Sequence, residues 1–334
     1  KEQNKFNFLM SKIALIFGIS GQDGAYLAKL LLSKGYVVHG TSRDSEIAEF
    51  TSLKRLGIKN KITFHSVALN DFRSILKILE KVSPKEIYNL AGQSSVGLSF
   101  EQPLETLESI ANATINILEA IRFININCRF YNASSSECFG DTGGKPADEN
   151  TPFRPKSPYG IAKASAFWQV SNYRESYELF ACSGIMFNHE SVLRPSRFVT
   201  RKICQSAANI ALGKQSILTL GDLTIKRDWG WAPEYVQAMW QMLQQNEAED
   251  FVIATGKIYG LDDFVREAFA SLDLDWKKYV TIKDSLKRPS EIRSGYGSPL
   301  KAKNILNWNA ETFMPEIASL MTKQEFDYLK RKSH

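Results

Sequence analysis

Four polar side chains stand at spacings that suit proton transfer. Tyr159 and Lys163 are four residues apart, so on a helix they would share one face. A tyrosine has an ordinary pKa of ~10, which must fall by about three pH units before the phenolate can act as a base near neutrality. Burial opposes that fall, so a positive charge such as Lys163 has to supply it. Ser135 could bond to the same substrate hydroxyl, and the carboxylate of Glu137 could remove a proton from carbon.

A glycine-rich turn near the start of the chain is typical of dinucleotide binding. Three glycines with the spacing G-x-x-G-x-x-G follow the apolar run 13–17 and precede a helical pattern that starts at Ala25. Glycines let the backbone approach a pyrophosphate, and the helix N-terminus offers N–H groups and a partial positive charge to it. The candidate cofactor contacts in this turn are Gly18, Gly21, Gln22, Asp23 and Gly24.

The remaining elements alternate between strand and helix and predict an α/β fold. Ser157 and Pro158 are a suitable N-cap and first residue for the helix that carries Tyr159. Strands are expected at 13–17, 36–41, 62–67, 86–92, 129–134 and 180–187. Helices are expected at 25–33, 72–81, 103–123 and 158–176. This alternation predicts a Rossmann-like doubly wound parallel sheet, with Ser135 at the carboxyl end of a strand, where ligands bind in such sheets.

The second half of the chain predicts a smaller C-terminal substrate-binding lobe. The alternation becomes irregular after residue 190, until a helix at 233–245 and a strand at 251–256 return to the sheet. We therefore expect an NAD(P)-binding Rossmann domain of residues 11–190, completed by 233–256. The substrate-binding lobe would comprise the remaining ranges, 191–232 and 257–325.

The end of the second predicted strand bears on the choice of cofactor. An acidic residue there would hold the ribose 2′-hydroxyl of NAD, whereas an arginine favours the 2′-phosphate of NADP. Arg43 comes first at this point, which favours NADP. Asp44 follows it, and a carboxylate would repel the phosphate, so NAD stays open.

Composition excludes several classes of protein. The 334 residues carry a net charge of +6 with no basic block and no known nucleic-acid motif, so a nucleic-acid partner is not expected. The four cysteines stand far apart without a C-x-x-C pair, and there are only four histidines, so neither a disulfide framework nor a metal site is expected. No apolar stretch approaches the ~20 residues of a membrane span. These features together predict a cytoplasmic protein with buried free thiols.

Longer stretches resemble one family. The glycine turn, Ser135 and the Tyr159–Lys163 pair together are the pattern of extended short-chain dehydrogenase/reductases, which the chain resembles from about residue 12 to residue 320. Within that superfamily the chain is similar to GDP-mannose 4,6-dehydratases. The stretches that carry this more specific resemblance are 172–177, 188–191, 198–203, 227–230, 249–256 and 288–291.

The resemblance implies a dehydratase with an internal hydride cycle, acting on GDP-mannose and using NADP. It implies catalytic roles for Ser135, Glu137, Tyr159 and Lys163. Besides the glycine turn, it implies cofactor contacts at Arg43, Leu69, Leu90, Ala91, Tyr159, Lys163, His189 and Arg194. It implies substrate contacts at Ser94, Glu137, Asn188, Val199, Lys202, Leu220, Gly221, Arg227, Arg288 and Glu291. It also implies a homodimer or homotetramer and no metal.

Departures from the family pattern leave alternatives open. The family usually has aspartate where Ala68 stands, a second arginine where Asp44 stands, and histidines where Ser95 and Trp231 stand. The substrate could therefore be a GDP-linked heptose. The chain could also be an NAD(P)-dependent nucleotide-sugar epimerase or reductase, or a nucleotide-binding module without activity. Glu137 discriminates between these, because only a dehydratase needs a base for the proton α to a transient ketone.

Overall fold

The computed structural model describes residues 12–283 and 292–332. The described chain forms two compact units. The first unit contains residues up to 135 together with 158–185 and 236–251, and the second contains 136–157, 186–235 and the chain from 252 onward. Residues 136–157, which the sequence suggested for the Rossmann domain, group with the second unit.

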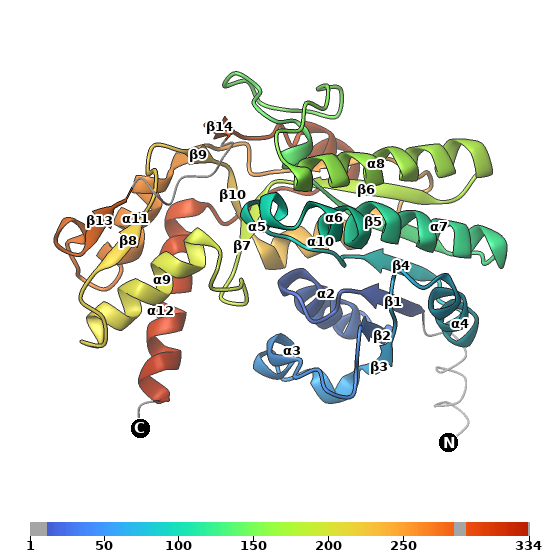
Figure 1. The fold of residues 1–334 in the computed structure, drawn as a ribbon, viewed down its shortest axis with the longest axis horizontal. Helices are drawn as coiled ribbons and strands as arrows, with labels where there is room; N and C mark the ends of the chain where they lie inside the picture. The colour runs from blue at the N-terminus through green and yellow to red at the C-terminus, as the bar shows by residue number, and fades with distance from the viewer. Residues whose placement is uncertain (1–11, 284–291, 333–334) are drawn as a thin grey trace. The chain divides into compact units, whose positions relative to one another are not determined.

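A seven-stranded sheet forms the centre of the first unit, in the order β11-β6-β5-β4-β1-β2-β3 (Figure 1). Its strands are β1 (Ile13–Phe17), β2 (Val37–Ser42), β3 (Thr63–Ser66), β4 (Glu86–Asn89), β5 (Arg129–Ser135), β6 (Ala181–Met186) and β11 (Phe251–Ile253). The pairs β1–β2, β2–β3, β1–β4 and β4–β5 are parallel. The strand order reverses between β1 and β4, as in the Rossmann fold, and this confirms the predicted fold class.

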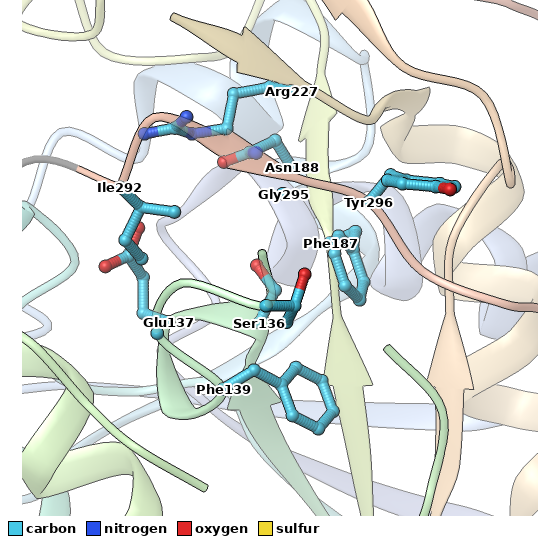
Figure 2. A pocket seen from close by; sticks show the side chains of 11 residues that line it. Ser136, Glu137, Phe139, Phe187, Asn188, Arg227, Ile292, Gly295 and Tyr296 are labelled. Atoms are coloured by element: carbon cyan, nitrogen blue, oxygen red, sulfur yellow. The ribbon is translucent and has the colours of Figure 1, made fainter. Parts of the chain in front are cut away.

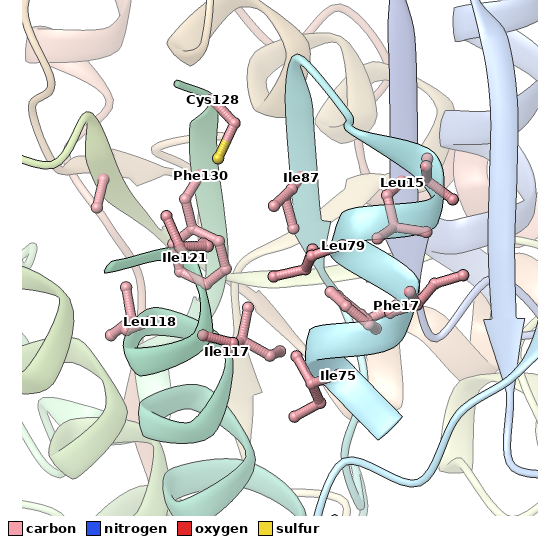
Figure 3. Packing of buried hydrophobic residues seen from close by; sticks show 14 of the residues in the cluster. Leu15, Phe17, Ile75, Leu79, Ile87, Ile117, Leu118, Ile121, Cys128 and Phe130 are labelled. Atoms are coloured by element: carbon pink, nitrogen blue, oxygen red, sulfur yellow. The ribbon is translucent and has the colours of Figure 1, made fainter. Parts of the chain in front are cut away.

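Helices cover both faces of this sheet. They are α2 (Gln22–Ser33), α3 (Thr51–Arg55), α4 (Phe72–Val82), α5 (Val96–Glu101), α6 (Pro103–Leu107), α7 (Ala113–Phe123) and α8 (Pro158–Tyr177), with a π-helical turn at Glu108–Asn112. The main core lies between the sheet and helices α4, α7 and α8 (Figure 3). Phe17, Ile87 and Phe130 enter it from the strands, and Leu79 and Ile117 enter from the helices. Burial of these apolar side chains is the main force that holds the helices to the sheet.

The second unit has short strands and three packed helices. The strands pair as β7 (Asn188–Glu190) with β10 (Trp229–Trp231), and as β8 (Leu218–Leu220) with β13 (Val280–Ile282). A three-stranded sheet joins β12 (Tyr259–Gly260), β9 (Lys226–Arg227) and β14 (Ser294–Gly295). The helices α9 (Val199–Ala211), α11 (Leu261–Ala270) and α12 (Met314–Arg331) pack on one another.

The expectation for the stretch after residue 190 needs correction, whereas the expected returning helix and strand are present. The stretch after residue 190 is not irregular throughout, because α9 occupies Val199–Ala211. The returning helix and strand do exist, as α10 (Ala232–Met242) and β11, and β11 joins the sheet beside β6. Among the helices of residues 12–283 and 292–332, none is long and apolar enough to cross a membrane.

Candidate active site

The glycine turn is a tight loop in which neighbouring backbone leaves no room for a Cβ at Gly18 or Gly24. Gly18 adopts a positive φ of 85°, and a Cβ there would lie 2.8 Å from the carbonyl oxygen of Leu90. A Cβ on Gly24 would lie 2.5 Å from the carbonyl oxygen of Gly18. Gly21 is the N-cap of α2 and provides no side-chain cap to the helix. The first N–H groups of a helix have no partners within the helix, so this turn fits a dinucleotide phosphate.

The end of β2 presents Arg43 with its side chain exposed. The carboxylate of Asp44 accepts the backbone N–H groups of Glu46 at 3.0 Å and Ile47 at 3.3 Å. Asp44 is therefore engaged in its own loop.

The Tyr159–Lys163 pair lies at the start of α8. The ammonium of Lys163 donates to the carbonyl oxygen of Ala133 at 2.6 Å and lies 5.8 Å from the centre of the Tyr159 ring. The Tyr159 ring packs against a small core of Ile110, Ala162 and Ala166, which limits its movement. Ala133 is two residues before Ser135, the buried last residue of β5. Helix α8 packs on β5, so the fold brings the tyrosine–lysine pair to the strand that ends at Ser135.

A pocket lies within the second unit. Arg227 and Asn188 lie on one side of it, and Glu137, Ser136 and Phe139 lie on the other (Figure 2). The remaining lining residues are Gly140, Thr142, Phe187, Ile292, Gly295 and Tyr296. A carboxylate, a guanidinium and an amide thus share one pocket with aromatic walls, which suits an anionic ligand that also carries hydroxyl groups.

Asp228 follows the pocket residue Arg227 in the sequence, and its carboxylate is buried. It accepts hydrogen bonds from Thr255, Gly256 and Gly297. Burial raises the pKa of Asp228 to about 6, and these hydrogen bonds limit the rise. Its charge also contributes to the raised pKa of Tyr235 and Tyr259, whose main cause is burial.

The comparisons with known proteins agree with the fold and show the family. A family model described as GDP-mannose 4,6 dehydratase matches residues 15–321. The chain belongs to this family. It is 42% identical over 331 residues to GDP-mannose 4,6 dehydratase 2 of Arabidopsis thaliana, covering 96% of this chain and 88% of that protein. It is 42% identical to the GDP-mannose 4,6-dehydratase of Sinorhizobium fredii (96% and 98% covered) and 40% identical to that of Homo sapiens (95% and 92%).

Solved structures with lower identity share the fold of this family member. The dTDP-glucose 4,6-dehydratase of Streptomyces venezuelae, with NAD and TYD bound, has a TM-score of 0.84 at 18% identity, covering 96% of this chain and 98% of that one. RMD from Pseudomonas aeruginosa, complexed with NADPH, has a TM-score of 0.79 at 19% identity, with 96% and 99% covered. At these identities the likeness concerns the fold alone.

The structure distributes the predicted substrate residues of this GDP-mannose dehydratase family member among several places. Glu137, Asn188 and Arg227 share the pocket. A second group lies where α9 meets β8: Lys202 donates to the carbonyl oxygen of Thr219 at 2.7 Å. The predicted residues of this group are Val199, Lys202, Leu220 and Gly221. Arg288 and Glu291 lie outside the described residues.

Two predicted cofactor residues of the second unit, His189 and Arg194, contact neighbouring backbone and side-chain groups. His189 lies in β7, its Nδ1 is 2.7 Å from the carbonyl oxygen of Phe187, and its ring stacks on Tyr235 at 4.7 Å. Because Nδ1 must donate to that carbonyl, a neutral His189 has Nε2 as an acceptor. Arg194 lies 3.3 Å from Glu190 and over the ring of Phe198.

The loop after β4 carries Ser94, a predicted substrate contact, and is shaped by its neighbour Gln93. The Gln93 amide donates to the carbonyl oxygen of Ser95 at 2.8 Å and to the hydroxyl of Thr106 at 3.1 Å. Ser95, which stands where the family usually has histidine, caps α5 by accepting the N–H of Leu98 at 3.2 Å. The departure at Ser95 therefore has a local structural role.

Sequence reasoning missed the aromatic walls of the pocket and Asp228. The only sequence signal for Phe139 was its place two residues after Glu137, and for Phe187 its place next to Asn188. Nothing in the sequence pattern indicated that Tyr296 lines the same pocket. Asp228 did stand within a stretch that carried the family resemblance, at 227–230.

Proposed function

We propose that this protein is a GDP-mannose 4,6-dehydratase, which converts GDP-mannose to GDP-4-keto-6-deoxymannose with loss of one water. Family membership over nearly the whole chain supports this. The observation that carries the choice of reaction is Glu137, a carboxylate that lies in a pocket with Arg227 and Asn188. A base near a bound sugar is what a dehydratase requires and a simple epimerase does not.

In this proposal Tyr159 takes the proton of the sugar 4-hydroxyl, and Lys163 stabilises the phenolate. The short bond from Lys163 to the Ala133 carbonyl fixes the position of the ammonium charge near the tyrosine ring. Ser135 hydrogen-bonds to the same hydroxyl. The glycine turn would hold a nicotinamide dinucleotide, which would supply hydride-transfer chemistry that is redox-neutral over the whole reaction.

Glu137 then acts as the base for the proton on C5, which the neighbouring ketone acidifies. The C6 hydroxyl leaves as water with the proton that Glu137 took from C5, passed directly or through Ser136, which lines the same pocket. When C6 gains the hydride, C5 regains a proton, and the proton that Tyr159 took from the 4-hydroxyl balances it. Arg227 would pair with the pyrophosphate of the nucleotide sugar, since a guanidinium can donate two parallel bonds to phosphate oxygens.

The proposed cofactor is NADP. The glycine turn fits the pyrophosphate, and the exposed Arg43 follows β2, where the 2′-phosphate of NADP would lie. The predicted contacts at Leu69, Leu90 and Ala91 follow β3 and β4.

A second copy of this chain is the proposed partner. Helices α6 and α8 pack together and expose four large apolar side chains: Leu104, Leu107, Ile161 and Trp168, with exposures of 75%, 40%, 54% and 60%. Clusters of exposed apolar side chains of this kind mark interaction surfaces. We therefore propose a homodimer or homotetramer in which this surface is covered. The four buried free cysteines suit the proposed cytoplasmic location.

The experiment that tests the proposed reaction is incubation of the purified protein with GDP-mannose, alone, with NADP and with NAD, followed by mass spectrometry of the nucleotide sugar. Loss of one water without net reduction of the cofactor is the expected result. An unchanged mass in all three incubations, with cofactor shown to be bound, would exclude GDP-mannose as the substrate. GDP-linked heptoses would then be tested.

Glu137→Gln separates the dehydratase from an epimerase or reductase. The variant keeps the size and shape of the side chain but replaces one acceptor oxygen by an NH₂ group and cannot accept the C5 proton. We expect water loss to fall by about 10²–10⁴-fold, while GDP-mannose binding changes little. Retention of nearly full turnover in Glu137→Gln would contradict the role given to this carboxylate.

A further inference from the structure

The carboxylate of Asp228 is fully buried and has no part in the proton transfers described above. It accepts the backbone N–H of Thr255 at 3.0 Å and its hydroxyl at 2.6 Å. It also accepts the N–H groups of Gly256 at 3.0 Å and Gly297 at 3.4 Å. Four donors from two separate segments therefore converge on one side chain, and burying a carboxylate is costly unless such bonds compensate.

One of these segments forms a wall of the pocket. Gly297 follows Tyr296 and Gly295, which both line the pocket. The backbone N–H of Asp228 donates to the carbonyl oxygen of Gly295 at 3.0 Å, while the side chain accepts from Gly297. Asp228 thus holds this segment on both sides of Tyr296.

The same segment is packed tightly against a second part of the pocket. A Cβ on Gly297 would lie 2.6 Å from the ring of Phe187 and from the Cβ of Ala254. Phe187 lines the pocket and precedes Asn188. A shift of Gly297 would therefore change the position of the Phe187 ring.

The 136–157 stretch, which supplies a third group of lining residues, is hydrogen-bonded to the 295–298 segment as well. Ala147 donates to the carbonyl oxygen of Tyr296 at 3.0 Å and accepts the N–H of Ser298 at 2.8 Å. Ala147 belongs to the 136–157 stretch, which contributes Glu137, Phe139 and Thr142 to the pocket. The 295–298 segment therefore connects the lining residues of three chain segments, and Asp228 attaches it to Arg227.

We propose that Asp228 is a positioning residue for nucleotide-sugar binding, which holds Arg227 and the 295–297 segment at the spacing that the substrate requires. This inference rests on the proposed function, because it assumes that the pocket binds the nucleotide sugar. A carboxylate suits the task because it has two acceptor oxygens for four donors. Asparagine offers one acceptor oxygen and alanine offers none.

The test compares Asp228→Asn and Asp228→Ala with the wild type. An asparagine can turn its oxygen toward Gly256 and Gly297 and direct its NH₂ group to the Thr255 hydroxyl oxygen, so only the Thr255 N–H loses its acceptor. We therefore expect the Kd and the KM for GDP-mannose to rise about threefold in Asp228→Asn and about tenfold or more in Asp228→Ala. The kcat of the folded fraction should stay within about twofold, because binding of ground state and transition state weakens equally.

The matched control is Glu234→Gln. Glu234 is a carboxylate of the same unit that accepts the backbone N–H groups of Glu311 at 3.0 Å and Thr312 at 3.1 Å and does not line the pocket. This control should lower thermal stability as the Asp228 variants do, but leave the KM unchanged. If Asp228 had only a structural role, its variants would likewise lose thermal stability without a change in the KM for GDP-mannose.

Binding is measured by titration calorimetry with GDP-mannose on each folded variant, and KM and kcat by water loss. An unchanged Kd in Asp228→Asn and Asp228→Ala, with tight binding to the wild type, would overturn this inference alone. If Asp228→Ala does not fold, an unchanged Kd in Asp228→Asn is sufficient to overturn it. Absence of GDP-mannose binding to the wild type would overturn the proposed function together with this inference.

Discussion

Replacing Gly21 and Gly24 separately by alanine should distinguish the glycine needed for a ligand from the glycine needed for packing. A Cβ on Gly24 would lie 2.5 Å from the carbonyl oxygen of Gly18 and 2.6 Å from the Cα of Ile19, both backbone atoms. Relieving such contacts costs about 3 kcal/mol at the upper end of overpacking effects. The better helix propensity of alanine returns about 1 kcal/mol. Gly24→Ala should therefore lower the unfolding free energy by about 2 kcal/mol.

Gly21→Ala should behave differently. Gly21 has φ −72° and ψ 174°, which alanine adopts without strain. Its Cβ would meet only the Gly18 carbonyl oxygen, at 3.4 Å. Losing a glycine N-cap costs less than ~1 kcal/mol, and a stiffer unfolded chain returns about 0.4–1 kcal/mol. The unfolding free energy should therefore hardly change. The new methyl group would stand where the pyrophosphate approaches α2, so we expect the Kd for NADPH to rise about tenfold, which is a loss of about 1.4 kcal/mol of binding free energy.

The assay measures two quantities on protein stripped of nucleotide. Urea unfolding gives the free energy of unfolding, and fluorescence titration with NADPH gives the Kd. The reasoning is refuted if Gly21→Ala loses as much stability as Gly24→Ala, or if Gly21→Ala binds NADPH as tightly as the wild type does.

Three further outcomes follow from the contacts described here. Burial raises the pKa of the Asp228 carboxyl from 3.8 to about 6, so the folded state binds a proton there more tightly than the unfolded chain does. The unfolding free energy should therefore rise by up to about 3 kcal/mol as the pH falls from 7 to 4. Urea unfolding of Asp228→Asn should lack this rise. Arg174→Leu leaves the carboxylate of Asp250 without its two guanidinium bonds of 3.0 and 2.6 Å, and should cost about 3 kcal/mol in urea unfolding without a change in KM. Trp168→Glu, with Leu104→Glu as a second variant, should shift the protein toward monomer in light scattering; an unchanged mass in both would exclude the proposed surface.

The first unit could be predicted well from the sequence because its signals are local. Strand β1 is a continuous apolar run, and α4 places Ile75, Ile78, Leu79 and Val82 on one buried face, so these two elements were located to within one residue. The glycine turn and the Tyr159–Lys163 pair are likewise short-range patterns.

Helix α9 could not be found in this way because its buried face is partly polar. Thr200, Arg201 and Ser206 are buried together with Ile203 and Cys204, so the apolar period is interrupted. The burial of Arg201 depends on Glu325, 124 residues away. The pocket walls had the same difficulty, since they combine residues from 136–142, 187–188, 227 and 292–296, whose proximity no local pattern encodes.

The cysteines make this protein convenient for attaching a reporter group. All four thiols are buried, and burial raises the pKa of Cys128 and of Cys204 to about 12. Thiolate is the form that reacts with maleimides and iodoacetamides, so these native thiols should be slow to label in the folded protein. A single cysteine introduced at the exposed Lys145, whose carbonyl accepts the hydroxyl of the pocket residue Thr142 at 2.6 Å, would therefore be labelled selectively. A dye at this position would follow the filling and emptying of the pocket in real time, in the otherwise native sequence.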